Sequence, residues 1–191
     1  MSNGLYRNKG LGFTCKIPEG WVLRTDEMNA EEDARNKTGE ENRDEVGRTT
    51  GGDCPHNCSK VLLAAFSRPP EAKGEDVNSS ILIAAESADS YPGLKDALQY
   101  FEPLTEVAKA QGFVADEEPY EFAVGSKTVA RGDFHKNVGT RVMRQSTLAM
   151  LSHGYAVSIT VIGGTEDEVE ELIDGLEFQA GGKPDSSRSP K

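Results

Sequence analysis

Alternating apolar and polar side chains open the chain and predict two short strands. Positions 13, 15 and 17 are apolar while 14 and 16 are polar, a pattern typical of a strand with one buried face. A Pro-Glu-Gly turn at 18–20 separates this strand from a second alternation that begins at Trp21. We therefore expect a tight corner between two strands, with Cys15 in the core and Trp21 covering it.

Two continuous apolar runs, 61–66 and 81–85, predict strands that are buried on both faces. We interpret them as hairpin neighbours and expect helices on both sides of the sheet. From 94 to 112, apolar residues recur at three- and four-residue spacing, which predicts an amphipathic helix. Pro103 lies inside this helix, and we expect a kink or a split near Phe101 because proline lacks an amide hydrogen and clashes with the preceding turn.

The second half of the chain predicts a meander that runs directly into a capped helix. Four strand candidates lie at 120–124, 127–134, 140–151 and 155–161. Gly125 and Ser126 supply a two-residue hairpin turn between the first two. Thr165 followed by Glu168 is typical of a capping box, in which each residue satisfies a free amide at the start of a helix. The apolar stripe that follows predicts the buried face of that helix.

Together these elements predict a single α+β domain over residues 1–180. We expect an antiparallel β-sheet of about six to seven strands flanked by helices, an α/β/α sandwich. The length of 191 residues is in the range of one ordinary domain. Residues 181–191, rich in Gly, Ser, Pro and charged side chains, are expected to form a disordered tail.

One segment, 26–59, interrupts this regular pattern. It contains ten Asp and Glu against four Lys and Arg, and few apolar side chains. Such a composition buries too little apolar area to offset the entropy lost on ordering. We therefore interpret it as a long acidic loop insertion with at most one helical turn, at 30–35. Loops of this length in compact domains are usually functional or disordered, so this segment is the first place to look for function.

The charge of the whole chain narrows the class of partner. A formal net charge of −11 argues against nucleic acid and anionic lipid, because phosphate binding draws its affinity from Lys and Arg that release counterions. The sequence has no apolar run long enough to predict a transmembrane helix, and residues 1–11 lack the pattern of a signal peptide. A basic protein or a cation would suit this charge.

The compact cluster of ligand-type side chains in the sequence is Cys54, His56 and Cys58, within the acidic segment. Two thiolates and an imidazole suit zinc or copper, although a fourth ligand is not evident. The alternatives are a local disulfide between Cys54 and Cys58, in an oxidising compartment, or two inert thiols. The sequence leaves these three alternatives open, and cofactors are expected only if the metal alternative holds.

No arrangement of side chains in the sequence predicts catalysis. His135 follows a predicted strand and His153 lies in a predicted turn. We interpret both as ordinary surface residues, because no nucleophile or orienting carboxylate stands beside either in a recognisable motif. We therefore expect a protein without enzymatic activity.

The N-terminal motif resembles the start of PsbP-like domains. The residues that carry this resemblance are Tyr6, Arg7, Asn8, Gly12, Phe13 and the run Ile17, Pro18, Glu19, Gly20, Trp21. The predicted order of elements is also similar to the PsbP fold, an antiparallel sheet between helices, over residues 6–178. Members of this group act as binding or assembly factors, among them a photosystem subunit, a Ran-binding import factor and bacterial lipoproteins. The resemblance is nearest to small exported bacterial proteins, and it transfers no site residue.

These observations favour a non-enzymatic binding or assembly module with an unidentified protein partner. The resemblance favours an exported, periplasmic or extracellular protein over a cytoplasmic one. We expect the acidic segment 26–59 and the adjoining sheet edge to form the contact surface. The alternative function is a metal-binding or redox protein that uses Cys54, His56 and Cys58.

Overall fold

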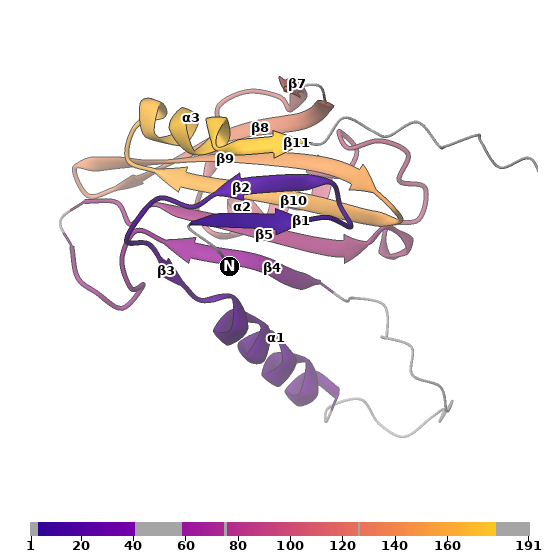
Figure 1. Cartoon of the computed structure of the whole chain (residues 1–191), viewed down its shortest axis with the longest axis horizontal. Helices are drawn as coiled ribbons and strands as arrows, with labels where there is room; N and C mark the ends of the chain where they lie inside the picture. Colours follow the sequence, from indigo (N-terminus) through magenta and orange to yellow (C-terminus); the bar gives the residue numbers. More distant parts are fainter. Residues whose placement is uncertain (1–3, 41–58, 75, 126, 179–191) are drawn as a thin grey trace, which may run out of the picture.

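The computed structural model describes residues 4–40, 59–74, 76–125 and 127–178 (Figure 1). Its larger sheet has eight strands, and neighbouring strands pair antiparallel throughout. In spatial order they are β3 (Val22–Leu23), β4 (Lys60–Phe66), β5 (Ser80–Ser87), β10 (Tyr155–Gly163), β9 (Arg141–Ser152), β8 (Lys127–Val138) and β6 (Val114–Ala115), with β7 (Tyr120–Val124) also paired to β8. The expected α+β class with an antiparallel sheet is confirmed.

A second, three-stranded sheet accompanies the first, which the sequence pattern did not predict. Its order is β1 (Leu5–Asn8), β2 (Phe13–Lys16) and β11 (Leu176–Phe178). The first strands of the chain therefore pair with a strand near its end, Cys15 opposite Leu176. A single sheet of six to seven strands was expected because strand periodicity does not reveal which distant strand becomes the neighbour.

Both faces of the larger sheet are covered. One face packs under the small sheet and α3 (Glu166–Asp174), with buried side chains from both sheets in a common core. The opposite face packs under residues 91–113, which include α2 (Phe101–Ala110). Figure 1 shows β1 and β2 lying in front of the larger sheet. The expectation of cover on both faces is confirmed, although strands do part of the covering that was assigned to helices.

The principal helix is shorter than its apolar periodicity indicates. α2 begins at Phe101, and residues 94–100 form turns instead of helix. Pro103 therefore lies in the first helical turn, where backbone amides have no partner within the helix and a missing amide hydrogen costs nothing. A kink or split was predicted near Phe101; instead the helix begins there, and no helical piece precedes it in residues 94–100.

The capping of α3 differs from the expected box in one hydrogen bond. The Thr165 hydroxyl accepts from the backbone N–H of Glu168 at 3.1 Å, as predicted. The Glu168 carboxylate, however, accepts from the N–H of Gly164 at 2.8 Å and from the hydroxyl of buried Ser79. Glu168 therefore ties the start of α3 to Ser79, the residue before β5, in addition to satisfying an amide at the helix start.

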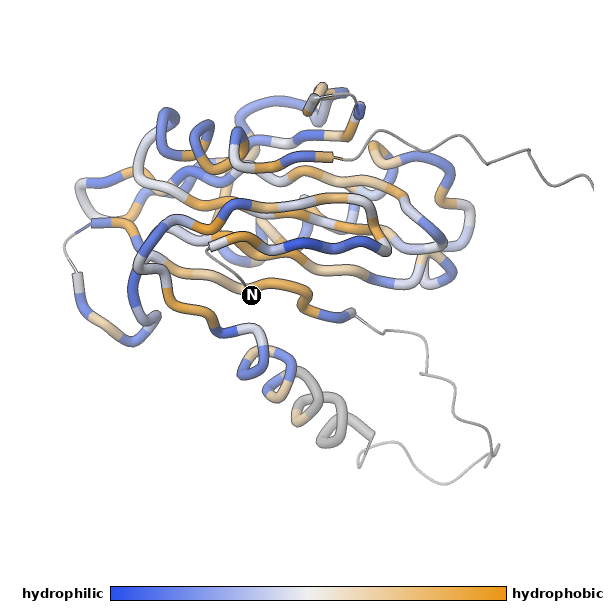
Figure 2. Tube along the Cα trace, in the orientation of Figure 1, coloured by the Kyte–Doolittle hydropathy of each residue, from blue (hydrophilic) through white to orange (hydrophobic). Residues whose placement is uncertain are grey.

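The acidic segment begins as a regular helix. α1 (Thr25–Glu40) covers residues in which only one helical turn was predicted, and residues 41–58 lie outside the described part of the chain. Figure 2 shows that apolar residues gather on the strands of the two sheets, whereas the described start of α1 is largely hydrophilic.

No described helix is long and apolar enough to span a membrane.

Candidate functional site

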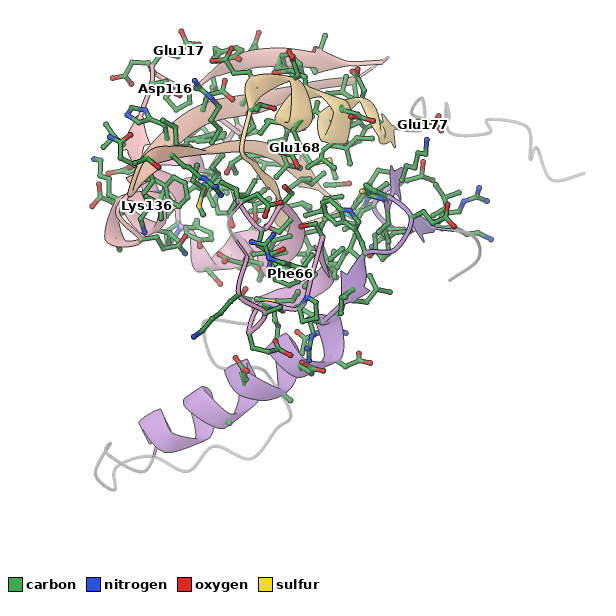
Figure 3. All side chains as sticks on the ribbon, turned by 90° about the vertical axis from the view of Figure 1, so that its left-hand side faces the viewer. Phe66, Asp116, Glu117, Lys136, Glu168 and Glu177 are labelled. Carbon is green, nitrogen blue, oxygen red and sulfur yellow. The ribbon has the colours of Figure 1, made fainter. Side chains whose placement is uncertain are left out.

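Two adjoining clefts meet at the first turn of α3. The first has a volume of about 810 Å³ and the second about 500 Å³. Arg144, Glu166 and Asp167 line both clefts, and we call the two adjoining clefts together the α3 groove. Figure 3 shows Asp116, Glu117 and Glu168 on the side of the molecule that carries the start of α3.

The first cleft has an apolar wall with a single aromatic side chain. Trp21, Val77 and Val142 contribute this wall. A turn places Trp21 here, because Gly20 adopts φ +83°, a conformation that suits glycine, and the N–H of Trp21 reaches the carbonyl of Pro18 at 3.4 Å. Trp21 is half-buried against the main core, so the predicted covering role is confirmed and part of its ring remains available in the cleft.

The second cleft is acidic. Six carboxylates and two guanidiniums line it, an excess of four negative charges: Asp116, Glu117, Asp133, Glu166, Asp167 and Glu170 against Arg131 and Arg144. Both arginines already have carboxylate partners, since Arg144 pairs with Glu166 at 3.0 Å and Arg131 pairs with Asp133 and Glu170. The uncompensated negative charge therefore faces the solvent in the cleft.

A buried polar network forms the floor of the acidic cleft. The Arg131 Nε atom donates to both oxygens of Asp133 at 3.0 Å, and its terminal nitrogens donate to Glu170 on α3. Asp133 also accepts from the hydroxyls of Tyr120, at 2.8 Å, and Ser146. The Arg131 side chain is only 8% exposed. Every polar group of the floor is thus paired, as buried charges require.

Strand geometry brings these residues to one face. Arg131 and Asp133 are two positions apart on β8, so both point toward α3, while Ala130 and Phe134, at the alternate positions, lie in the other core. Ser146 lies directly opposite Asp133 on β9, and Tyr120 lies opposite Arg131 on β7. The guanidinium also lies over the ring of Phe122, 4.7 Å from its centroid, a favourable cation–π arrangement.

Burial and pairing shift the titration of two groups in the floor. Burial by itself lowers the pKa of the Arg131 guanidinium, but its bonds to Glu170 and Asp133 outweigh burial, so that the pKa lies above its ordinary value. Burial, together with the hydrogen bond to Asp133, raises the pKa of Tyr120 to about 12. The arginine is therefore charged and the tyrosine neutral throughout the physiological range.

The site residues predicted from sequence are not the residues that form this groove. Cys54, His56 and Cys58, proposed as ligands for zinc or copper, lie outside the described residues. Among the residues that the structure does describe, no group of three or more His, Cys, Asp or Glu has the geometry to hold a metal ion. Cys15 is a buried free thiol, as expected, and burial raises its pKa to about 12.

The two remaining histidines have different surroundings. His135 Nδ1 forms a hydrogen-bonding contact with Asp116, a residue that lines the acidic cleft. His153 adopts φ +52° in the turn between β9 and β10 and contacts the hydroxyl of Ser152 at 3.0 Å. Both histidines were predicted to be plain surface residues. The contact between His135 and the cleft has no local signal in the sequence, because Asp116 lies nineteen positions earlier in the chain.

One signal in the sequence does point to the groove. On β8, Arg131 and Asp133 occupy the same strand parity as buried Val129. Charged residues at positions that periodicity assigns to the core have to be paired. Their partners on β7, β9 and α3 could not be identified from the pattern, because none is local in sequence.

Comparisons with known proteins agree with this architecture. No protein-family model matches the sequence, and no curated protein matches it. The fold is similar to that of a crystal structure from Bacteroides thetaiotaomicron, with TM-score 0.44 and 14% identity over 96% of this chain and 51% of that one. The chain thus spans about half the length of that protein.

Two further solved structures are similar over most of both chains. The cyanobacterial PsbP (CyanoP) of Synechocystis has TM-score 0.47 and 15% identity over 91% of each chain. The Ran-binding protein Mog1p of Saccharomyces cerevisiae has TM-score 0.46 and 13% identity over 93% of this chain and 96% of that one. The PsbP-like resemblance of the N-terminal motif and these likenesses concern the fold alone, and a likeness of this degree assigns no partner or activity.

Proposed function

We propose that this protein is a non-enzymatic binding or assembly module that captures a basic segment of another protein in the α3 groove. The observation that carries the proposal is the excess of four negative charges in the acidic cleft, directly beside the apolar wall formed with Trp21. A segment that carries Lys or Arg next to an apolar side chain complements both parts of the groove.

Unpaired carboxylates supply the attraction. Among the described residues, Glu117 and Asp167 form no ion pair, and Glu170 is about half exposed although it contacts Arg131. A lysine or arginine from a partner would meet Glu117 and Asp167 without displacing a cation that already belongs to the protein. The net charge of −11 would also accelerate encounter with a basic partner at low ionic strength.

The floor of the cleft supplies rigidity. Arg131, Asp133 and Ser146 lie on adjacent strands of the larger sheet and hold one another by side-chain hydrogen bonds. A groove built on such elements keeps its shape without the partner, and preorganisation lowers the entropic cost of binding. Trp21 at the apolar end is the residue type that most often dominates binding energy at protein interfaces.

Fluorescence anisotropy with a labelled peptide of alternating lysine and leucine tests the proposal, with the matching glutamate–leucine peptide as the negative probe. Asp167→Asn and Glu170→Gln should each weaken binding by about fivefold, because each removes a partly exposed charge worth roughly 1 kcal/mol. Trp21→Ala should weaken it by about tenfold or more. Binding should also decrease steeply as salt is added.

Asp89→Asn is the matched control, since Asp89 is an exposed carboxylate on the 3₁₀ turn η1 (Ala88–Ser90), outside the groove. This control should bind the lysine–leucine peptide like the unaltered protein. Equal weakening by the control and the groove variants would mean that only the overall charge attracts the peptide, and the proposal would then be wrong.

Two further expectations stay predictions. Action outside the cytoplasm is supported by the sequence resemblance to exported bacterial proteins, and cell fractionation with sequencing of the native N-terminus would test it. The metal-binding or redox alternative rests on Cys54, His56 and Cys58, which the structure does not describe.

A further inference from the structure

The outer edge of β4 is covered by side chains in place of a strand. β3 pairs only with the last two residues of β4, Phe66 and Ala65. Beyond them, the edge faces the start of α1 (Figure 1). An uncovered strand edge presents free N–H and C=O groups that pair with other strands, so the nature of this cover matters for how the protein associates.

Asn29 occupies the position that a neighbouring strand would take. Its side-chain amide donates to the carbonyl of Val61 at 2.9 Å and accepts from the N–H of the same residue at 3.0 Å. One side chain thus reproduces the two hydrogen bonds that an antiparallel partner residue would exchange with Val61.

The next outward-facing residue of β4 is satisfied in a similar way. The N–H of Ala64 donates to the hydroxyl of Thr25 at 3.0 Å, and its carbonyl accepts from the N–H of Arg24 at 2.9 Å. Thr25 and Asn29 are four residues apart and therefore share one face of α1. A shift in register between Val61 and Leu63 explains why the outward residues are 61 and 64, three positions apart.

Residues 25–30, at the start of α1, contact this edge mainly through polar side chains. Asp26, Glu27 and Ala30 are exposed, and Met28 is only half-buried. The described part of α1 contributes no side chain to either core cluster. Helices in proteins are held chiefly by a buried apolar face, so α1 is able to detach while both cores stay intact.

The edge under α1 suits a second copy of the same chain. Residues 61–66 of β4 carry no charge in a chain whose net charge is −11, so this strand avoids the repulsion that opposes self-association elsewhere. A second β4 also presents the same outward groups at the same spacing. Around a two-fold axis, Val61 of each copy would face Val61 of the other and exchange the two hydrogen bonds that Asn29 makes in the closed form, while Ala65 and Phe66 keep their pairing to β3, a self-complementary antiparallel pair.

We propose that α1 covers the β4 edge reversibly. When α1 dissociates, the exposed edge pairs antiparallel with β4 of a second copy of the chain. Asn29 and Thr25 are the residues that keep the edge closed. This surface lies on a different part of the sheet from the α3 groove, so the proposal does not depend on the function assigned to that groove.

Hydrogen exchange of the unaltered protein gives the first test. The amides of Val61 and Ala64 face α1, whereas those of Leu63 and Ala65 alternate with them and face β5. If α1 detaches by itself, Val61 and Ala64 should exchange at least about tenfold faster than Leu63 and Ala65. Equal rates would mean that the edge opens only when the whole sheet opens, and would overturn the proposal.

Sedimentation across a concentration series gives the second test. Thr25→Val combined with Asn29→Ala should lower the dimer dissociation constant by at least about tenfold relative to the unaltered chain. Ala30→Gln, at an exposed position of the same helix, should leave it unchanged. Adding Leu62→Lys to the double variant should restore the monomer, because charges on an edge strand block pairing.

The outcomes separate the alternatives. A double variant that stays monomeric with its circular dichroism spectrum intact would contradict the proposal. A dimer that persists after Leu62→Lys would point to another surface and would contradict it equally. If the double variant does not fold, the exchange rates of the unaltered protein decide the question.

Discussion

Replacing Arg131 by methionine tests the claim that the floor of the acidic cleft is a buried, mutually dependent network. Methionine keeps much of the length and apolar volume of arginine but has no charge and no donor. Arg131 is 8% exposed and binds two carboxylates, Asp133 at 20% and Glu170 at 49% exposed. The substitution leaves Asp133 poorly compensated, while Glu170 is able to turn to solvent.

The magnitude follows from these exposures. Removing one partner of a fully buried ion pair costs roughly 3–5 kcal/mol of unfolding free energy. Asp133 retains two hydroxyl donors, Tyr120 and Ser146, so we expect a smaller loss of about 2–3 kcal/mol. That loss includes a contribution of roughly 0.5–1 kcal/mol from the cation–π contact with Phe122. For a chain of this size the melting temperature should decrease by about 5–10 °C.

Urea unfolding followed by the fluorescence of Trp21, the single tryptophan of the chain, measures this change directly. Arg141→Met removes an exposed guanidinium from the same sheet and should alter stability by less than about 0.5 kcal/mol. The double variant Arg131→Met with Asp133→Asn should be more stable than Arg131→Met alone, because it also removes the uncompensated carboxylate charge of Asp133. A loss below about 1 kcal/mol for Arg131→Met, or a double variant less stable than the single one, would refute the reasoning.

Three other predictions concern titration and thiol chemistry. Because the pKa of Tyr120 is raised to about 12 in the folded protein, its contribution to stability is complete below the ordinary tyrosine value near 10 and is lost as pH rises toward 12. Tyr120→Phe should therefore weaken the alkaline loss of stability measured by urea unfolding between pH 9 and 12, and an unchanged slope would contradict this. Cys15, buried and with a pKa raised to about 12, should resist iodoacetamide at pH 8 in the folded protein and react after unfolding, as intact mass spectrometry would show. The same measurement on native protein decides between the alternatives for Cys54 and Cys58, since a disulfide removes two hydrogens, bound zinc or copper adds its own mass, and free thiols leave the mass of the chain unchanged.

Local features of this protein were predictable because their causes are local. The alternation in β2, the meander of β8 to β10 and the capping threonine of α3 each depend on residues within a few positions of one another. The irregularity near Phe101 was predicted for the same reason, since Pro103 acts only on its own helical turn, although it proved to be the helix start and not a kink or split.

The errors have a common physical origin. α1 was predicted as loop because its composition has little apolar surface, yet the helix forms where Thr25 and Asn29 meet the backbone of β4, more than thirty residues away. Likewise, the periodicity of β2 indicates a strand with a buried face, but not that its partner is β11 at the other end of the chain. In both cases the deciding contacts join distant segments.

The sequence by itself determined that the chain is an α+β protein with an antiparallel sheet, a half-buried Trp21 and a capped last helix. Arg131 and Asp133 share the strand parity of Val129 in the sequence, but no role was predicted for them. Only the tertiary structure decided that these charges meet Glu170, Tyr120 and Ser146 to form the floor of a groove. The reason is that hydrophobic periodicity records which face of an element is buried, whereas a site depends on which distant elements cover that face.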